Sequence, residues 1–296
     1  MTRDKPWRGV MVATALPLKA DLSVDFDAFG EHCRWLVASG CDGVVPNGSL
    51  GEYQTLTAGE RAQVVRTAVT AIGADRVMPG IAAYGAQEAR RWAEQAGEAG
   101  CGAVMLLPPN SYRGDERATI EHYRIVAEAG VPIVAYNNPI DTKIDLTPAL
   151  LAQLYAEGLI VAVKEFTGDV RRAYEIAEQA PGLDLLVGSD DVLLELALAG
   201  AVGWVAGYPN ALPEATVRLY RAAMAGDLGV AQPLYRALHP LLRWDAKIEF
   251  VQAIKLSMDL AGRPGGGCRP PRQPLLPAQA AAVRAATEKA LAEGLR

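Results

Sequence analysis

Histidine and cysteine are both scarce in this chain of 296 residues, which contains three of the first and four of the second. None of the histidines (His32, His122 and His239) has another histidine, a cysteine or paired carboxylates at the short spacing of a metal site. A Ser-His-Asp triad also needs a histidine at the reacting centre. The sequence therefore gives poor support to either kind of site. The cysteines are scattered without a CxxC pair, and we expect free thiols.

Long apolar stretches and blocks of like charge are absent as well. The longest apolar runs are strand-sized, well short of the roughly 18 residues of a membrane span. The polar stretch 1–9 has no signal-peptide core. We therefore expect a cytoplasmic protein that does not bind membranes. The net charge is −5 without a basic cluster, so nucleic acid is not an expected partner either.

A glycine-rich nucleotide-binding turn is missing too, because the first apolar run is followed by the residues 16–19, Leu-Pro-Leu-Lys. This argues against a doubly wound open sheet, which usually has such a turn. Half of the residues are hydrophobic, enough for a large core, and short apolar runs alternate with amphipathic helical patterns. The alternation favours an α/β fold, a closed parallel (β/α)8 TIM barrel covered by helices. Eight runs resemble strands: 9–16, 43–47, 77–82, 103–107, 132–136, 159–164, 184–187 and 202–206.

The helical patterns carry recognisable ends. Thr57 and Glu60 form a capping-box pattern, and glycines stand where a C-cap residue belongs after several helices. Beyond the eighth run, residues 213–296 contain helical patterns near 213–225, 230–242, 246–261 and 277–293 but no further clear strand. We therefore expect a barrel over residues 1–212 and a C-terminal helical appendix over 213–296 that packs on it. The earlier helical segments lie near 25–39, 57–72, 86–99, 115–129, 147–156, 170–179 and 190–199.

Lys164 stands at the end of the sixth expected strand. Burial at such a position disfavours the charged ammonium and lowers the pKa of a lysine. A neutral amine is a nucleophile that can form a Schiff base with a carbonyl substrate. A lysine at a strand end can equally extend its charge into solvent, so this residue alone does not decide between the two interpretations.

Other polar groups are expected at the same rim, because the active site of a barrel lies at the C-terminal ends of its strands. Tyr136 ends the strand next to that of Lys164. The turn 48–52, Gly-Ser-Leu-Gly-Glu, exposes backbone N–H groups suited to a carboxylate. An amine, a phenol and an anion-binding turn together indicate a 2-oxo acid that becomes a protonated imine. That imine supports cleavage, condensation, dehydration or deamination beside the former carbonyl.

These motifs resemble the dihydrodipicolinate synthase / N-acetylneuraminate lyase family of class I aldolases. The resemblance runs from about Gly9 to Leu260, and the order and spacing of the motifs fit the family throughout. It rests on GSLGE (48–52), YNNP (136–139), VKEFTGD (163–169), GSDD (188–191) and GWVAGYPN (203–210).

The resemblance implies a role for several residues. Lys164 is similar to the Schiff-base lysine and Tyr136 to the proton-shuttling tyrosine of the family. Ser49, with Gly48 and Leu50 in the same turn, matches the loop that binds the carboxylate of the 2-oxo acid. Val205 matches the apolar residue whose carbonyl lies near the reacting centre. The family also implies a homotetramer, a dimer of dimers, and no cofactor.

Three residues depart from the dihydrodipicolinate synthases of this family. Leu50 replaces a threonine, and Asn110 replaces a tyrosine of their proton relay, with Tyr112 two residues away. Asp141 replaces the arginine that holds the carboxylate of the aldehyde substrate. An acidic residue would repel that carboxylate by about 1–3 kcal/mol. We therefore expect that the chain is not a true dihydrodipicolinate synthase.

Carboxylates at the rim also disfavour a phosphorylated substrate. Asn110, Asn138 and Ser189 are expected to hydrogen-bond substrate hydroxyls. Pyruvate or a 2-keto-3-deoxy sugar acid is then a fitting substrate for an aldolase or a dehydratase. A deaminase of a cyclic imino acid derived from hydroxyproline is an alternative within the family. A non-catalytic protein that binds a small acid and a metal-dependent aldolase are alternatives of other classes, the last disfavoured by the scarcity of histidine.

Overall fold

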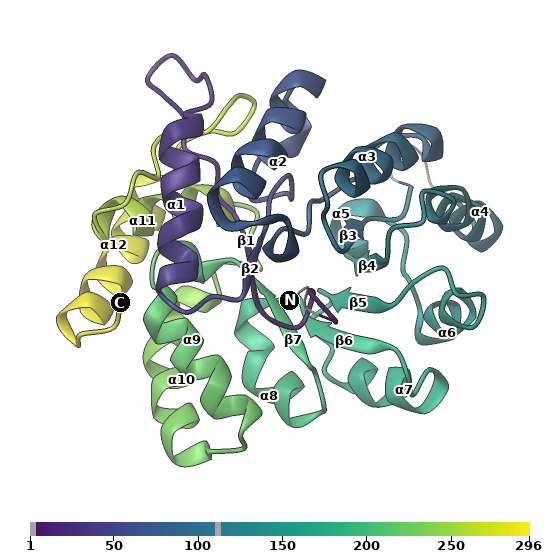
Figure 1. Cartoon of the computed structure of the whole chain (residues 1–296). Coiled ribbons are helices and arrows are strands. Elements are labelled where there is room, and N and C mark those ends of the chain that lie inside the picture. Colours follow the sequence, from purple (N-terminus) through teal and green to yellow (C-terminus); the bar gives the residue numbers. More distant parts are fainter. Residues whose placement is uncertain (1–3, 110–113) are drawn as a thin grey trace.

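The computed structural model describes residues 4–109 and 114–296, and its strands form a parallel barrel enclosed by helices (Figure 1). The seven strands of the described part are β1 (Gly9–Ala13), β2 (Gly43–Val45), β3 (Val104–Leu106), β4 (Ile133–Asn137), β5 (Ala162–Glu165), β6 (Asp184–Val187) and β7 (Gly203–Ala206). They pair in parallel in the order β2-β1-β7-β6-β5-β4-β3. The expected TIM barrel with a C-terminal helical extension is confirmed.

The expected strand between β2 and β3 closes the barrel, although it does not form a regular ladder. Val77 bridges Val44 of β2, and Gly80 bridges Met105 of β3, both in parallel. Pro79 lies between the two bridges and has no N–H to donate, although its carbonyl accepts a hydrogen bond from the Met105 amide. The proline explains why an eighth strand is reduced to two isolated bridges.

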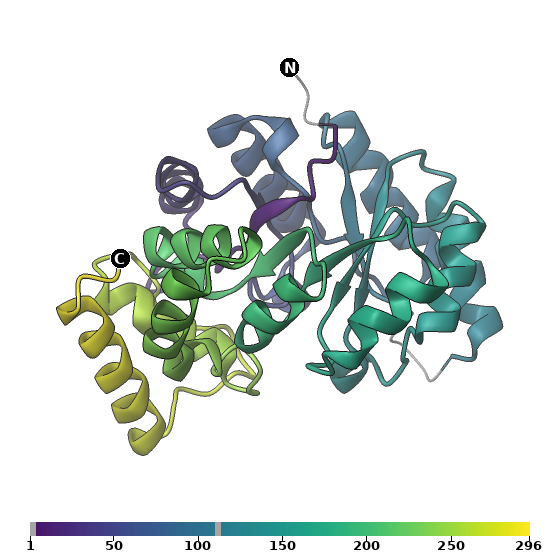
Figure 2. The same ribbon diagram turned by 90° about the horizontal axis from the view of Figure 1, so that it is seen from below.

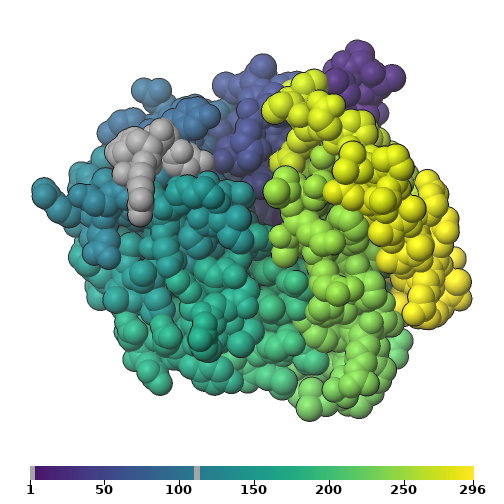
Figure 3. Space-filling model, turned by 180° about the vertical axis from the view of Figure 1, so that it is seen from behind, coloured from purple at the N-terminus to yellow at the C-terminus, as the bar shows by residue number. Residues whose placement is uncertain are grey.

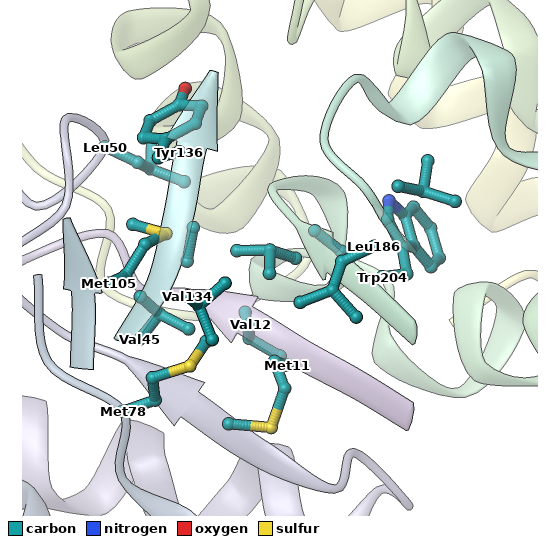
Figure 4. Close-up of a cluster of buried hydrophobic side chains, with 14 of the residues drawn as sticks. Met11, Val12, Val45, Leu50, Met78, Met105, Val134, Tyr136, Leu186 and Trp204 are labelled. Atoms are coloured by element: carbon teal, nitrogen blue, oxygen red, sulfur yellow. The ribbon is translucent and has the colours of Figure 1, made fainter. Parts of the chain in front are cut away.

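The interior of the barrel is filled by side chains from the strands. Met11, Met78 and Met105 are buried there, where flexible thioether chains fill irregular gaps. Figure 4 shows Tyr136 and Leu50 beside one another at one end of this cluster. The buried apolar interior explains why the strand sequences read as continuous hydrophobic runs.

The helices that follow the strands begin and end where their caps predict. The Thr57–Glu60 capping box is present, and glycines with positive φ end several helices, Gly40 (98°) and Gly200 (98°) among them. These helices are α1 (Phe26–Ala38), α2 (Ala58–Ile72), α3 (Ala86–Glu98), α4 (Glu116–Ala127), α5 (Pro139–Thr142), α6 (Pro148–Ala156), α7 (Arg171–Gln179) and α8 (Leu193–Leu198).

Four further helices follow β7: α9 (Pro213–Met224), α10 (Leu228–Leu242), α11 (Phe250–Leu260) and α12 (Pro277–Ala292). They pack on one side of the barrel, α9 against α8, and α11 against α12 (Figure 2). The helix expected from residue 246 begins at Phe250 instead, which leaves the preceding residues in a turn. The division at residue 212 stays a prediction. None of the helices described here is long and apolar enough to cross a membrane.

Candidate active site

Lys164 and Tyr136 stand side by side at the ends of β5 and β4, where they are register partners. The Lys164 Nζ atom lies 4.2 Å from the centre of the Tyr136 ring and 5.5 Å from that of Phe166. Lys164 is 5% exposed, so the strand end does not release it into solvent. The expected adjacency of the amine and the phenol is confirmed.

The Lys164 ammonium has no hydrogen-bond or ion-pair partner among the residues that the structure describes. Burial lowers the pKa of Lys164 to about 8, and the negative charges of Asp245 and Asp190 oppose this shift. A lysine of this kind holds a useful fraction of neutral amine near neutral pH. It is therefore suited to attack a carbonyl carbon.

The Tyr136 hydroxyl is held by its own strand-end loop. It accepts a hydrogen bond from Asn138 Nδ2 at 3.2 Å, and the same amide donates to Asp141 Oδ2 at 2.8 Å. Asn138 also caps the short helix α5 by accepting from the Asp141 amide. Burial raises the pKa of Tyr136 well above its usual value, so the phenol stays neutral. Because Asn138 donates to its oxygen, the phenol proton is free to point into the cavity.

The turn after β2 offers backbone donors. The N–H groups of Ser49 and Leu50 have no acceptor within residues 4–109 and 114–296. The turn is flanked by two residues in the left-handed region, Asn47 (φ 57°) and Glu52 (φ 54°). Such strained conformations persist where the surroundings fix them, and they concentrate at ligand-binding turns. This arrangement suits the binding of a carboxylate.

Glu52 anchors the end of that turn to the C-terminal segment. Its Oε1 accepts from Lys255 Nζ at 2.8 Å, and its Oε2 accepts from the Arg269 amide at 2.9 Å. Lys255 also donates to the Gly267 carbonyl at 2.7 Å. Both side chains of the Glu52–Lys255 pair are 1% exposed. Nothing in the sequence marked this ion pair, because its members lie 203 positions apart.

A cavity of about 440 Å³ opens at this rim. Most of the residues expected at the site line it: Gly48, Ser49, Leu50, Tyr136, Asn138, Asp141, Lys164 and Val205. Ser189 does not, since it is buried and donates to Asp191 at 2.7 Å. Asn110 and Tyr112 lie outside the described residues. No group of three or more potential metal ligands gathers within the described ranges.

The C-terminal segment supplies cavity residues that the sequence reasoning missed. They include Asp245, Lys247 and Ile248 from the turn before α11, Phe250 from its start, and Arg272. Burial raises the pKa of Asp245 to about 6, against the opposing charge of Lys164. No strand ends at these positions, so the rule that selected the other loops could not find them. Figure 3 shows the C-terminal segment, lime to yellow, beside the teal middle of the chain.

The pattern of the dihydrodipicolinate synthetase family matches residues 6–290 of the sequence. The chain belongs to this family. Its members are class I lyases, and the chain is accordingly a Schiff-base-forming enzyme of 2-oxo acids. The family membership confirms the resemblance inferred from the motifs.

Curated relatives and solved structures agree over nearly the whole length. The 4-hydroxy-tetrahydrodipicolinate synthase of Anaeromyxobacter dehalogenans is 34% identical over 286 residues, 94% of this chain and 95% of that protein. The synthase structure from Aquifex aeolicus aligns with a TM-score of 0.90 at 27% identity, covering 97% and 98% of the two chains. YagE, a prophage protein of the family from E. coli K12, solved with pyruvate, aligns with a TM-score of 0.87 at 26% identity, covering 98% and 99%.

The relatives also bear on whether this chain is a true dihydrodipicolinate synthase. Because the matched relatives carry the synthase name, the expectation that this chain is not a true synthase is not confirmed. That expectation continues to rest on Asp141, which lines the cavity.

Proposed function

We propose that Lys164 forms an imine with a small 2-oxo acid, and that the enzyme is a lyase or hydro-lyase acting on that imine. The observation that carries this proposal is the unpartnered Lys164 amine, which faces the Tyr136 ring inside the cavity. Ser49 and the free N–H groups of its turn would hold the carboxylate of the acid. The pyruvate complex of the E. coli relative supports this class of substrate.

The far end of the substrate is proposed to carry hydroxyls rather than a second carboxylate. By the family resemblance, Asp141 stands where the synthases have the arginine that binds the acidic aldehyde. Its carboxylate is already turned toward Asn138, and it adds negative charge to the cavity wall. A 2-keto-3-deoxy sugar acid fits this environment better than an acidic aldehyde does. Condensation to hydroxy-tetrahydrodipicolinate is correspondingly disfavoured.

A second candidate is a deaminase that opens a hydroxyproline-derived cyclic imino acid. The observation in its favour is that two carboxyl groups, Asp141 and Asp245, line the same cavity. Carboxylates favour a substrate whose ring nitrogen is protonated and leaves as ammonia. Release of ammonia from the cyclic imino acid, measured enzymatically, would distinguish this reaction from cleavage or dehydration of a sugar acid.

The test of the proposal is reductive trapping with borohydride. Pyruvate and a panel of hydroxylated 2-oxo acids are each reduced with the enzyme, and the adduct is located by peptide mass spectrometry. We expect an adduct on Lys164, strongest with the true substrate, and none in Lys164→Met. A folded wild-type enzyme without an adduct from any acid would instead support a non-catalytic protein that binds a small acid.

The assembly is proposed to be a homotetramer, as the family resemblance implies. Light scattering coupled to size-exclusion chromatography measures the mass directly. A monomer at micromolar concentration would contradict the proposal.

A further inference from the structure

Two buried carboxyl groups act electrostatically on Lys164, and one of them has both oxygens occupied. Asp190 accepts from Trp204 Nε1 at 2.9 Å, from the Tyr208 amide at 2.8 Å, and from the Gly207 amide at 3.1 Å at both oxygens. Burial and the charge of Asp245 raise the pKa of Asp190, whereas these amide donors lower it. With N–H groups directed at both oxygens, Asp190 holds the β6 and β7 loops together and has no oxygen available for exchange with Lys164.

Asp245 is different, because it is almost unpartnered. It accepts one long hydrogen bond at Oδ2, from the Asp190 amide at 3.3 Å, and no other from the described residues. Its Oδ1 lies beside Gly207, where a Cβ atom would approach to 2.6 Å, so only glycine leaves room for the carboxyl there. Asp245, Gly207 and Lys164 line the same cavity, and Asp245 is 8% exposed.

The groups that face Asp245 come from several elements. Lys164 belongs to β5 and Tyr136 to β4, Asp190 and Asp191 follow β6, and Tyr208 follows β7, and each of them interacts electrostatically with Asp245. Lys164 is the cation of this set, and its charge is the main influence that favours ionised Asp245 against burial. The amine and the carboxyl therefore influence one another's titration while lining one cavity.

We propose that Asp245 is the proton acceptor and donor of imine formation, taking a proton from the Lys164 ammonium and returning it to the hydroxyl that leaves. This role rests on the proposed function. The neutral amine attacks the carbonyl carbon, and the phenol of Tyr136 moves a proton from nitrogen to the new oxygen. Protonated Asp245 then protonates that hydroxyl, the C–O bond breaks, and water leaves. The ammonium and the ketone have become a protonated imine and one water, and Asp245 is a carboxylate again.

The pair predicts a particular pH profile for wild-type imine formation. The reactive form of the two groups carries one proton between them. The rate of imine formation is therefore highest between the two pKa values, about 6 for Asp245 and about 8 for Lys164. It falls in acid because both groups are protonated, and in alkali because no proton remains to release water. Quenched-flow borohydride trapping with pyruvate measures this rate. A wild-type rate that rises with pH and then stays level would overturn the role of Asp245 without the need for a variant.

The variant Asp245→Asn separates proton transfer from simple electrostatics. Removal of the charge lowers the pKa of Lys164, so an electrostatic role alone predicts faster trapping at neutral pH. Loss of the proton donor predicts trapping slower by about 10²-fold and no decline in alkali. Equal or faster trapping by the folded variant refutes the role of Asp245.

A matched control is Asp184→Asn. Asp184 is also buried, and it accepts from Trp7 and Arg8 near the start of β6, away from the cavity. This variant is expected to lose stability while keeping the wild-type pH profile of trapping. If wild-type enzyme forms no adduct with any acid, the proposed function itself fails. If wild-type enzyme forms the adduct and Asp245→Asn traps pyruvate with the wild-type rate and pH profile, the function stands and this inference falls.

Discussion

Lys164 and Lys255 are both buried lysines, but their surroundings differ in one respect. Lys255 of α11 is 1% exposed and lies 2.8 Å from Glu52 Oε1, with the Gly267 carbonyl as a second acceptor. Lys164 is 5% exposed and has an aromatic ring and an open cavity beside its amine, with no acceptor among the described residues. Burial is therefore common to both lysines. Under the proposed function, the absence of a direct acceptor is what distinguishes the reactive one.

Exchanging each lysine for methionine gives the largest contrast. Lys164→Met is expected to abolish turnover and the borohydride adduct, because the nucleophile itself is removed. Lys255→Met is expected to keep the adduct on Lys164 in the fraction of protein that remains folded. Peptide mass spectrometry after trapping compares the two variants. An adduct on Lys255 in the wild-type enzyme would reverse the two roles.

The tyrosine beside Lys164 can be tested next. Tyr136 faces Lys164, and Tyr136→Phe removes its hydroxyl while keeping the ring in place. Turnover is expected to fall by about 10²–10⁴-fold, the range for a group that transfers protons. Steady-state kinetics with the best-trapped acid measures the loss. A change below tenfold would show that another group moves the protons.

The free energy of unfolding is expected to depend strongly on the Glu52–Lys255 pair. Lys255→Met leaves the Glu52 carboxylate buried without its cation, which is expected to lower the free energy of unfolding by about 3–5 kcal/mol. The double variant Glu52→Gln with Lys255→Met removes both charges and should recover part of that loss. Urea unfolding followed by circular dichroism provides the values. Equal stability of the single variant and wild type would mean that the pair contributes little.

Lys164 should also make stability depend on pH. The pKa of Lys164 is about 8 when folded and 10.5 in its ordinary state, so between these values the unfolded chain binds more protons. The free energy of unfolding therefore rises with pH across this window, by an amount on the order of 3 kcal/mol for this residue. Lys164→Met should be more stable than wild type at neutral pH and lack that rise. A constant difference between the unfolding free energies of Lys164→Met and wild type at all pH values would contradict the lowered pKa of Lys164.

The smallest expected effect concerns Asp141, which lines the cavity of Lys164. Asp141→Arg replaces a repulsive charge with an attractive one, worth about 1–3 kcal/mol toward an acidic aldehyde. The ratio of kcat/KM for acidic and neutral aldehydes is expected to shift by roughly tenfold or more. An unchanged ratio would mean that the aldehyde does not reach this position.

Much of this arrangement could be predicted from local sequence. The alternation of apolar runs and helical patterns predicted the barrel. The rule that the site of a barrel lies at its strand ends predicted that Lys164, Tyr136 and Ser49 would meet, and they line one cavity. Pro79 interrupted an expected strand because a missing N–H matters more than an apolar pattern.

Asp245 could not be predicted as a cavity residue, for a different reason. Its segment has a helical pattern, but α11 begins only at Phe250, so Asp245 lies in the preceding turn. Ser189 was selected by its place after β6, but its side chain bonds to Asp191 instead of facing the cavity. Neither a side-chain contact within a turn nor the lining of a cavity leaves a local periodicity to detect.

The Glu52–Lys255 pair has a consequence for the order in which the enzyme is completed. Synthesis delivers the N-terminal part of a chain first, so the barrel strands leave the ribosome long before α11. Until Lys255 and the Arg269 amide arrive, the Glu52 carboxylate has neither of these partners, and the turn that presents Ser49 lacks this anchor. The turn proposed to bind the carboxylate is thus fixed by a segment that lies 203 positions later in the chain. A nascent chain should therefore acquire its affinity for 2-oxo acids only once this later segment has emerged and folded, as a late and abrupt event.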